Sequence, residues 1–198
     1  MHIELTDHLR CPADHPESFL VLIPGEMTGR SVASGVLGCP TCLREYPVVR
    51  GVAYFSPEPP AVATLPAPGP VDAAALAAFL GLEGPGGYVG LVGGAAGFAP
   101  GLAEQWPGIH LVAVNPPREL PAAEALSVLV APALPFKARA LRGVVVGEPY
   151  GGMSRWSEAA IGAVLPGLRA AGLGPVPSAP GFELMGEAGG WWVGRAGK

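Results

Sequence analysis

The chain has 198 residues, enough for one ordinary domain or two small ones. Hydrophobic residues make up 49% and charged residues 14%, which excludes a largely disordered chain. The 12 lysines and arginines are outnumbered by 16 aspartates and glutamates, and the formal net charge of −4 gives no indication of a nucleic-acid partner.

The start of the chain has neither the basic nor the apolar region of a signal peptide, so we expect a cytoplasmic protein. The longest uncharged stretch, residues 84–103, is rich in glycine and contains Pro100, so no membrane span is expected. In a cytoplasmic protein, three cysteines indicate thiolate or metal chemistry rather than disulfides.

Residues 1–56 are rich in β-branched and turn residues and predict a small β-rich domain. Residues 57–70 contain six prolines and predict an extended, semi-rigid linker. In the first domain, strands are expected at residues 19–23, 31–37 and 47–55.

Residues 71–198 alternate between helix-compatible segments and apolar runs, which favours an α/β domain with a mostly parallel sheet. Asp72 is placed to cap a helix that begins at Ala73. A second helix is expected over residues 156–171, with a bend near Pro166. Strands are expected at residues 88–92, 110–114, 126–130 and 143–147, and a closing hairpin at residues 182–187 and 191–195.

The three cysteines have the pattern of a metal site. Cys39 and Cys42 form a C-x-x-C knuckle, a spacing that lets two thiolates reach one tetrahedral Zn²⁺. Cys11 is the third candidate ligand, and either Asp14 or His15 offers the fourth. A closed site of this kind is structural, because no position stays open for water. The alternative is a ribbon without metal, in which the thiols are small buried hydrophobes.

The head resembles the small zinc-ribbon family that activates tRNA, ribosomal and release-factor methyltransferases. The matching motifs, Leu-x-Cys-Pro, Cys-x-x-Cys and Tyr-Pro-x-x-x-Gly, lie in residues 9–12, 34–42 and 46–52. The resemblance implies a zinc-ribbon fold, a bound zinc ion and a protein partner. At Asp14 the sequence departs from the family's pattern, because zinc-binding relatives commonly carry a cysteine there.

Residues 71–198 resemble the class I S-adenosylmethionine-dependent methyltransferases in the order of their motifs. Gly93 and Gly97 remain from the family's glycine loop, and Asn115 replaces the acid that ends the second strand. The resemblance implies that these three residues would contact S-adenosylmethionine. Leu91 and Ala95 occupy the positions of a loop acid and of the middle glycine, so the cofactor signature is incomplete.

Glu148 and Tyr150 follow the fourth expected strand, where amino-directed methyltransferases orient the target nitrogen. They are the candidate catalytic residues, against the alternative of a structural turn. The length of this half predicts a truncated sheet, because each βαβ unit needs about 30 residues.

The sequence therefore predicts a zinc ribbon followed by a truncated, Rossmann-like, mostly parallel sheet with a C-terminal hairpin. The expected function is that of a non-catalytic pseudo-methyltransferase, a scaffold or stabilising subunit for a protein partner or in a homo-oligomer. The alternatives are an active S-adenosylmethionine-dependent methyltransferase with an atypical cofactor site and a small-molecule binding module that uses the remnant crevice.

Overall fold

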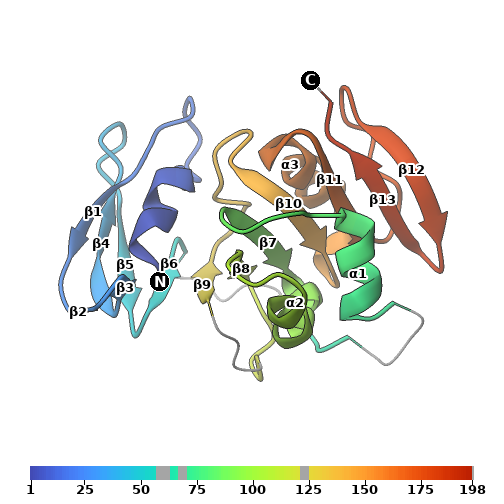
Figure 1. Cartoon of the computed structure of the whole chain (residues 1–198). Helices are drawn as coiled ribbons and strands as arrows, with labels where there is room; N and C mark the ends of the chain where they lie inside the picture. Colours follow the sequence, from blue (N-terminus) through green and yellow to red (C-terminus); the bar gives the residue numbers. More distant parts are fainter. Residues whose placement is uncertain (57–62, 67–70, 121–124, 198) are drawn as a thin grey trace.

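The computed structural model describes residues 1–56, 63–66, 71–120 and 125–197. Eleven strands of this part of the chain form one sheet, and two short strands form a separate ribbon (Figure 1). The strands of the first 56 residues are β1 (Val21–Pro24), β2 (Met27–Thr28), β3 (Ser31–Val32), β4 (Ser34–Gly38), β5 (Glu45–Val49) and β6 (Val52–Tyr54). The later strands are β7 (Tyr88–Val92), β8 (His110–Val114), β9 (Leu126–Val130), β10 (Leu141–Val146), β11 (Val164–Leu173), β12 (Glu183–Ala188) and β13 (Trp191–Arg195). The helices are η1 (Ile3–His8), α1 (Ala73–Leu80), η2 (Gly93–Phe98), α2 (Ala99–Gln105), η3 (Tyr150–Gly152) and α3 (Ser154–Ala163).

The head, defined as residues 1–56, contains the antiparallel strands β1, β4, β5 and β6. The expectation of one strand over residues 47–55 is wrong, because the chain reverses between β5 and β6. Arg50 and Gly51 both adopt positive φ at this turn, which matches the twist of a two-residue hairpin. The strand expected at residues 31–37 is also divided, between β3 and β4.

The second half forms the mostly parallel, Rossmann-like α/β sheet with a C-terminal hairpin that the sequence predicts. Strands β9, β8, β7, β10 and β11 run parallel, and β13 and β12 complete the sheet as an antiparallel pair. If β7 to β13 are numbered one to seven, their order is 3-2-1-4-5-7-6. It begins like the Rossmann order 3-2-1-4-5, in which the switch point lies between the strands here called β7 and β10.

The shortening of this half affects the helices rather than the strands. Seven strands are present, but residues 131–140 connect β9 to β10 without a helix. The expected helix over residues 156–171 is wrong in its second part, because α3 ends at Ala163 and β11 follows directly. Pro166 cannot continue a helix, and Gly167 has φ +83°.

Each face of the parallel sheet is covered differently. Asp72 caps α1 by accepting a hydrogen bond from the Ala75 amide at 2.8 Å, as its position predicts. Helices α1 and α2 pack on one face, against Val89, Leu91 and Leu111. The opposite face has η1 and α3 in place of two full-length helices. That face is built on Val92, Val114, Leu129, Phe136, Leu141, Val144 and Trp192.

The head joins this sheet in two ways. Strand β6 pairs in parallel with β9, so that Val52 lies beside Val128. On the face opposite α1 and α2, hydrogen bonds join the end of η1 to the loop after β9. The Arg10 amide donates to the Pro135 carbonyl, and the Lys137 amide donates to the His8 carbonyl, both at 2.9 Å. The head therefore extends the sheet at its edge and covers part of one face (Figure 1).

Among the described residues, the helices are all too short or too polar to cross a membrane.

Candidate functional site

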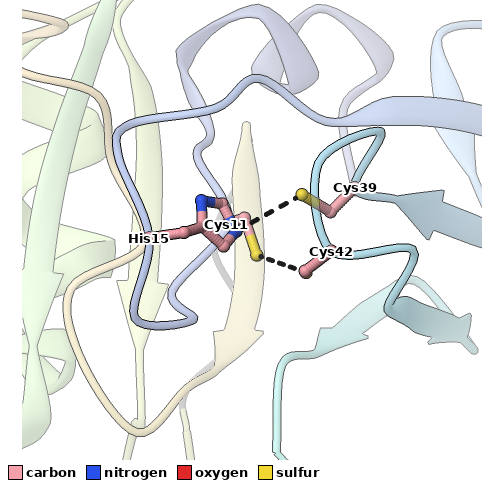
Figure 2. A group of neighbouring side chains, drawn as sticks. All are labelled: Cys11, His15, Cys39 and Cys42. Carbon is pink, nitrogen blue, oxygen red and sulfur yellow. Dashed lines mark hydrogen bonds between the residues drawn. The ribbon is translucent and has the colours of Figure 1, made fainter.

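The structure brings Cys11, His15, Cys39 and Cys42 into one group (Figure 2). The four candidate ligand atoms lie within 4.8 Å of one another. Two pairs are closer: the sulfurs of Cys11 and Cys42 are 3.7 Å apart, and Nε2 of His15 is 3.5 Å from the sulfur of Cys39. A Cys/His group of this kind could hold a metal ion.

The group is assembled from two loops that approach from opposite sides (Figure 2). The loop that carries Cys39 and Cys42 is a tight turn between β4 and β5. In this turn the Leu43 amide donates to the Cys39 carbonyl at 2.9 Å, and Leu43 adopts φ +58°. The loop that carries Cys11 and His15 follows η1. It is closed by the Cys11 amide, which donates to the Ser18 carbonyl at 3.1 Å. The Thr41 hydroxyl joins the loops through a 2.9 Å bond to that of Ser18.

His15 is oriented by a bond outside the group. Its Nδ1 lies 2.7 Å from the Pro16 carbonyl oxygen. Because a carbonyl only accepts, Nδ1 carries a proton, and Nε2 is the ring nitrogen that faces Cys39. Asp14, the other candidate for the fourth ligand, is exposed and lies outside the group.

Two of the six separations in the group match those of a tetrahedral zinc ion. Zn–S bonds of about 2.3 Å and Zn–N bonds of about 2.0–2.1 Å place neighbouring sulfurs about 3.8 Å apart, and a sulfur and a nitrogen about 3.6 Å apart. The observed 3.7 Å and 3.5 Å lie close to these values. Three soft sulfur donors and one imidazole are also the donor set that zinc favours over magnesium or calcium.

The thiols of the group differ in acidity. Burial acts to raise the pKa of Cys39, but bonds from the backbone of Cys42 and Thr41 to the sulfur outweigh it and lower the pKa to about 6. Burial raises the pKa of Cys11 above its ordinary value. The Cys11 sulfur has a further partner, because the Tyr46 hydroxyl lies 3.0 Å away. Burial raises the pKa of Tyr46, so this hydroxyl keeps its proton and is able to donate it in a hydrogen bond to the sulfur.

The second candidate region lies at the carboxyl ends of β7 and β10, at the switch point where open α/β sheets bind ligands. Gly93 has φ +61°, and a Cβ there would lie 2.5 Å from the Glu148 carbonyl oxygen and 2.6 Å from the Tyr150 ring. The Gly94 amide donates to the same carbonyl at 2.7 Å. The glycines of this loop therefore let it approach the chain's own backbone after β10.

Residues 63–66, here called the strap, also lie against the glycine loop. A Cβ on Gly97 would lie 2.5 Å from Cδ of Pro66 and 3.0 Å from a methyl of Leu65. A Cβ on Gly94 would lie 2.8 Å from the Thr64 carbonyl oxygen. Gly97 therefore leaves room for the strap.

Two cavities border the strap. One, of about 330 Å³, lies between the strap and the loops after β7 and β10, and the other, of about 300 Å³, lies between the strap and the loop after β8. The first is lined by Thr64, Leu65, Pro66, Gly94, Ala95, Gly147, Glu148 and Leu173. The second is lined by Ala63, Thr64, Leu65, Pro117, Arg118 and Glu119. Each volume is at the lower limit of small-molecule pockets, which is about 300 Å³.

Asn115 ends β8, as expected, but its side chain is 1% exposed. Its Nδ2 donates to the Ala131 carbonyl, and its Oδ1 accepts from the Ala131 amide, both at 2.8 Å. This pair of bonds ties the end of β8 to the end of β9. The polar atoms expected to meet a cofactor are thus used within the fold, and the cofactor role of Asn115 stays a prediction.

The two candidate catalytic residues do not face one site. Tyr150 is buried, with its ring 4.4 Å from that of Trp156, and burial raises its pKa. The Glu148 side chain is exposed, while the Glu148 carbonyl accepts from the Gly94 amide. This arrangement is that of a structural turn, and a catalytic role for either residue stays a prediction.

Sequence reasoning missed two features of these sites. The contact of Tyr46 with Cys11 joins β5 to the loop after η1, and no spacing in the sequence indicates it. Pro66 was assigned to a spacer between two domains, yet it packs on Gly97. One signal could have pointed to the strap. Gly97 is retained although the rest of the cofactor signature is incomplete, which indicates that something other than a cofactor requires a glycine there.

No family model matches the chain, and no similar protein is found among curated sequences. Solved structures resemble it weakly. The antibiotic-resistance methyltransferase Kmr is 18% identical, with 69% of this chain and 98% of that chain covered and a TM-score of 0.46. A predicted O-methyltransferase from Agrobacterium tumefaciens is 19% identical, covers 65% and 82%, and has a TM-score of 0.44. The third is a complex between the Haloferax volcanii Trm112 methyltransferase activator and a putative methyltransferase, with 20% identity, half of each chain covered and a TM-score of 0.40. Likenesses at this level carry no conclusion about the activity or partners of this chain.

Proposed function

We propose that this chain is a non-catalytic, methyltransferase-like protein with a structural zinc site, which serves as a scaffold or stabilising subunit for another protein. The observation that carries the proposal is the packing at the switch point. The glycine loop lies against the Glu148 carbonyl and against Leu65 and Pro66. A cofactor would need part of the space that the chain itself occupies.

The residues around this packing support the same function. A carboxylate that accepts hydrogen bonds from ribose hydroxyls makes bonds of roughly 1.5–3 kcal/mol each. The acid position after β8 is occupied by Asn115, whose amide is bonded to Ala131. The acid position in β7 is occupied by Leu91, which is fully buried in the core beneath α1 and α2.

Zinc has a structural role in this proposal. Cys11, His15, Cys39 and Cys42 supply four ligands, so the ion would have no open position for water or substrate. Bound zinc would hold the loop after η1 against the turn between β4 and β5, and so stabilise the head.

The outer face of the head supports a protein partner. The register of β1, β4, β5 and β6 places Val21, Ile23, Val49 and Tyr54 on one face of the sheet. Ile23 is 64% exposed and Val49 is 48% exposed. Gathered apolar side chains on a surface are typical of protein contacts. Light scattering of the purified chain will show whether the contact is made with a second copy.

An active S-adenosylmethionine-dependent methyltransferase with an atypical site is the second candidate. The two cavities beside the strap favour it, because displacement of residues 63–66 would join them. Replacement of Leu65 and Pro66 by glycine removes the side chains that pack on Gly97 and tests the two candidates. Calorimetry with S-adenosylmethionine is expected to show no saturable binding to this variant below about millimolar concentration, since the backbone after β10 still fills the site. Micromolar binding would instead favour the enzyme.

A further inference from the structure

The Tyr46 hydroxyl lies outside the four-ligand group and touches one of its sulfurs. It is 3.0 Å from Sγ of Cys11, and Cys11 and Tyr46 are 4% and 6% exposed. Water therefore does not compete freely for this bond. While Cys11 is a thiol, either atom can donate in this bond. A metal-bound thiolate can only accept, so a zinc-bound Cys11 would take the bond from the Tyr46 hydroxyl.

The Tyr46 ring is held in place from two directions. Strand β5 pairs with β4 on one side, with Tyr46 opposite Leu37, and with β6 on the other. The ring packs on that of Phe55 with centroids 5.1 Å apart. The hydroxyl is thus fixed by the sheet and not by the cysteine loops, so its position does not depend on a bound ion.

We propose that Tyr46 is a positioning residue of the zinc site, whose hydroxyl donates a hydrogen bond to the Cys11 thiolate and holds that ligand for the metal. The inference rests on the proposed zinc site. Three thiolates and one neutral imidazole around Zn²⁺ leave a net charge of −1, and a hydrogen bond to sulfur disperses part of it. The bond also restricts the Cys11 side chain before the ion arrives.

The test compares two variants that each remove one tyrosine hydroxyl from the head. Tyr46→Phe removes the donor to Cys11 and keeps the ring on Phe55. Tyr54→Phe is the control, since Tyr54 is partly exposed on β6 and its hydroxyl has no hydrogen bond within the described residues. Zinc affinity, measured on the full chain by competition with a chromophoric chelator, is expected to fall about 10–100-fold in Tyr46→Phe and to stay unchanged in Tyr54→Phe.

A spectrum of the cobalt-substituted protein shows whether a lower affinity of Tyr46→Phe comes from the lost hydrogen bond to sulfur or from weaker packing. A hydrogen bond stabilises the sulfur lone pairs, so its removal is expected to shift the thiolate-to-cobalt charge-transfer band of Tyr46→Phe to lower energy. This measurement can be made during refolding with cobalt, and so it does not require a folded metal-free variant.

Each outcome has one meaning. If the unaltered chain binds no zinc, the proposed zinc site is wrong, and this inference with it. If the unaltered chain binds one zinc ion while Tyr46→Phe keeps the same affinity and the same charge-transfer band, only the role of Tyr46 is overturned. A lower affinity together with the shifted band supports it.

Discussion

At the residue scale, substitutions of Asp14 and His15 are expected to have different effects on zinc binding, although the two residues are neighbours in the chain. Nε2 of His15 lies beside the sulfur of Cys39, whereas Asp14 is exposed and lies outside the group. We expect His15→Ala to weaken zinc binding by about 10-fold or more, because the ion loses one of four ligands. Asp14→Ala should bind zinc as the unaltered chain does. Chelator competition measures both, and equal losses would show that the fourth ligand is not His15.

His110 predicts a dependence of stability on pH. Burial lowers the pKa of its ring to about 4, and the neighbouring His2 ring and terminal amine act in the same direction. The folded ring therefore stays neutral, while the unfolded ring takes up a proton near pH 6.5. The contribution of this neutral ring to stability is complete above pH 6.5 and is lost as the pH falls from 6.5 toward 4.

The variant His110→Gln keeps a polar group near the Ser127 hydroxyl, which lies 2.8 Å from Nε2 of His110, and removes the titration. Urea unfolding at pH 7 and pH 5 should show a smaller loss of stability in the variant than in the unaltered chain. Excess zinc in every sample makes the titration of the metal ligands common to both. Equal losses would mean that His110 titrates normally in the folded protein.

Which residues belong to the metal site could be predicted from the sequence only where their spacing determines it. The knuckle of Cys39 and Cys42 follows from its two-residue separation, and the structure places Cys11, the third ligand expected from the sequence, in the same group. The choice between Asp14 and His15 could not be made, because both lie a few residues after Cys11 in a loop without periodicity. In the structure, the bond from Nδ1 of His15 to the Pro16 carbonyl orients the His15 ring, and Nε2 lies beside Cys39.

At the element scale, η3 connects β10 to α3 and packs beneath the end of β11. A Cβ on Gly151 would overlap the backbone carbonyl of Leu173, whereas a Cβ on Gly152 would have no neighbour within 4 Å. We expect Gly151→Ala to reduce the free energy of unfolding by roughly 1–3 kcal/mol, because the clash is with backbone. Gly152→Ala should change it little. Urea denaturation compares the two, and similar values would mean that η3 is not packed as described.

Elements were predictable where local periodicity and tertiary pairing agree. The strands β7, β8 and β9 have the expected ends, because each is a short apolar run bounded by turn residues. The sequence predicts that the segment after Ala163 continues a helix to residue 171. Pairing with β10 and β13 makes this segment the strand β11. No pattern within the segment itself indicates these two partner strands.

At the scale of the whole molecule, the division into residues 1–56, 57–70 and 71–198 stays a prediction. The pairing of β6 with β9 and the bonds of η1 to residues 135–137 are contacts between the first and last of these parts. They were not predictable from sequence, because a proline-rich segment between two domains is typical of a spacer.

These contacts predict how a cleaved chain behaves. After a cut between residues 57 and 62, the two fragments should elute together from a size-exclusion column at the volume of the intact chain. The sheet pairing and the buried face hold them without the covalent link. The same sample in urea is the control and should separate. Separation without denaturant would show that the head is an independent domain.

The central claim is that the chain's own residues occupy part of the space that a cofactor would need at the switch point of the sheet. Calorimetric titration of the unaltered, zinc-loaded chain with S-adenosylmethionine tests it most directly. The account predicts no saturable binding below about millimolar concentration at neutral pH, because the Glu148 carbonyl and the strap occupy the space beside Gly93 and Gly97. Micromolar binding that disappears when Gly93 and Gly97 are replaced by bulky residues would contradict the account and identify a working cofactor site.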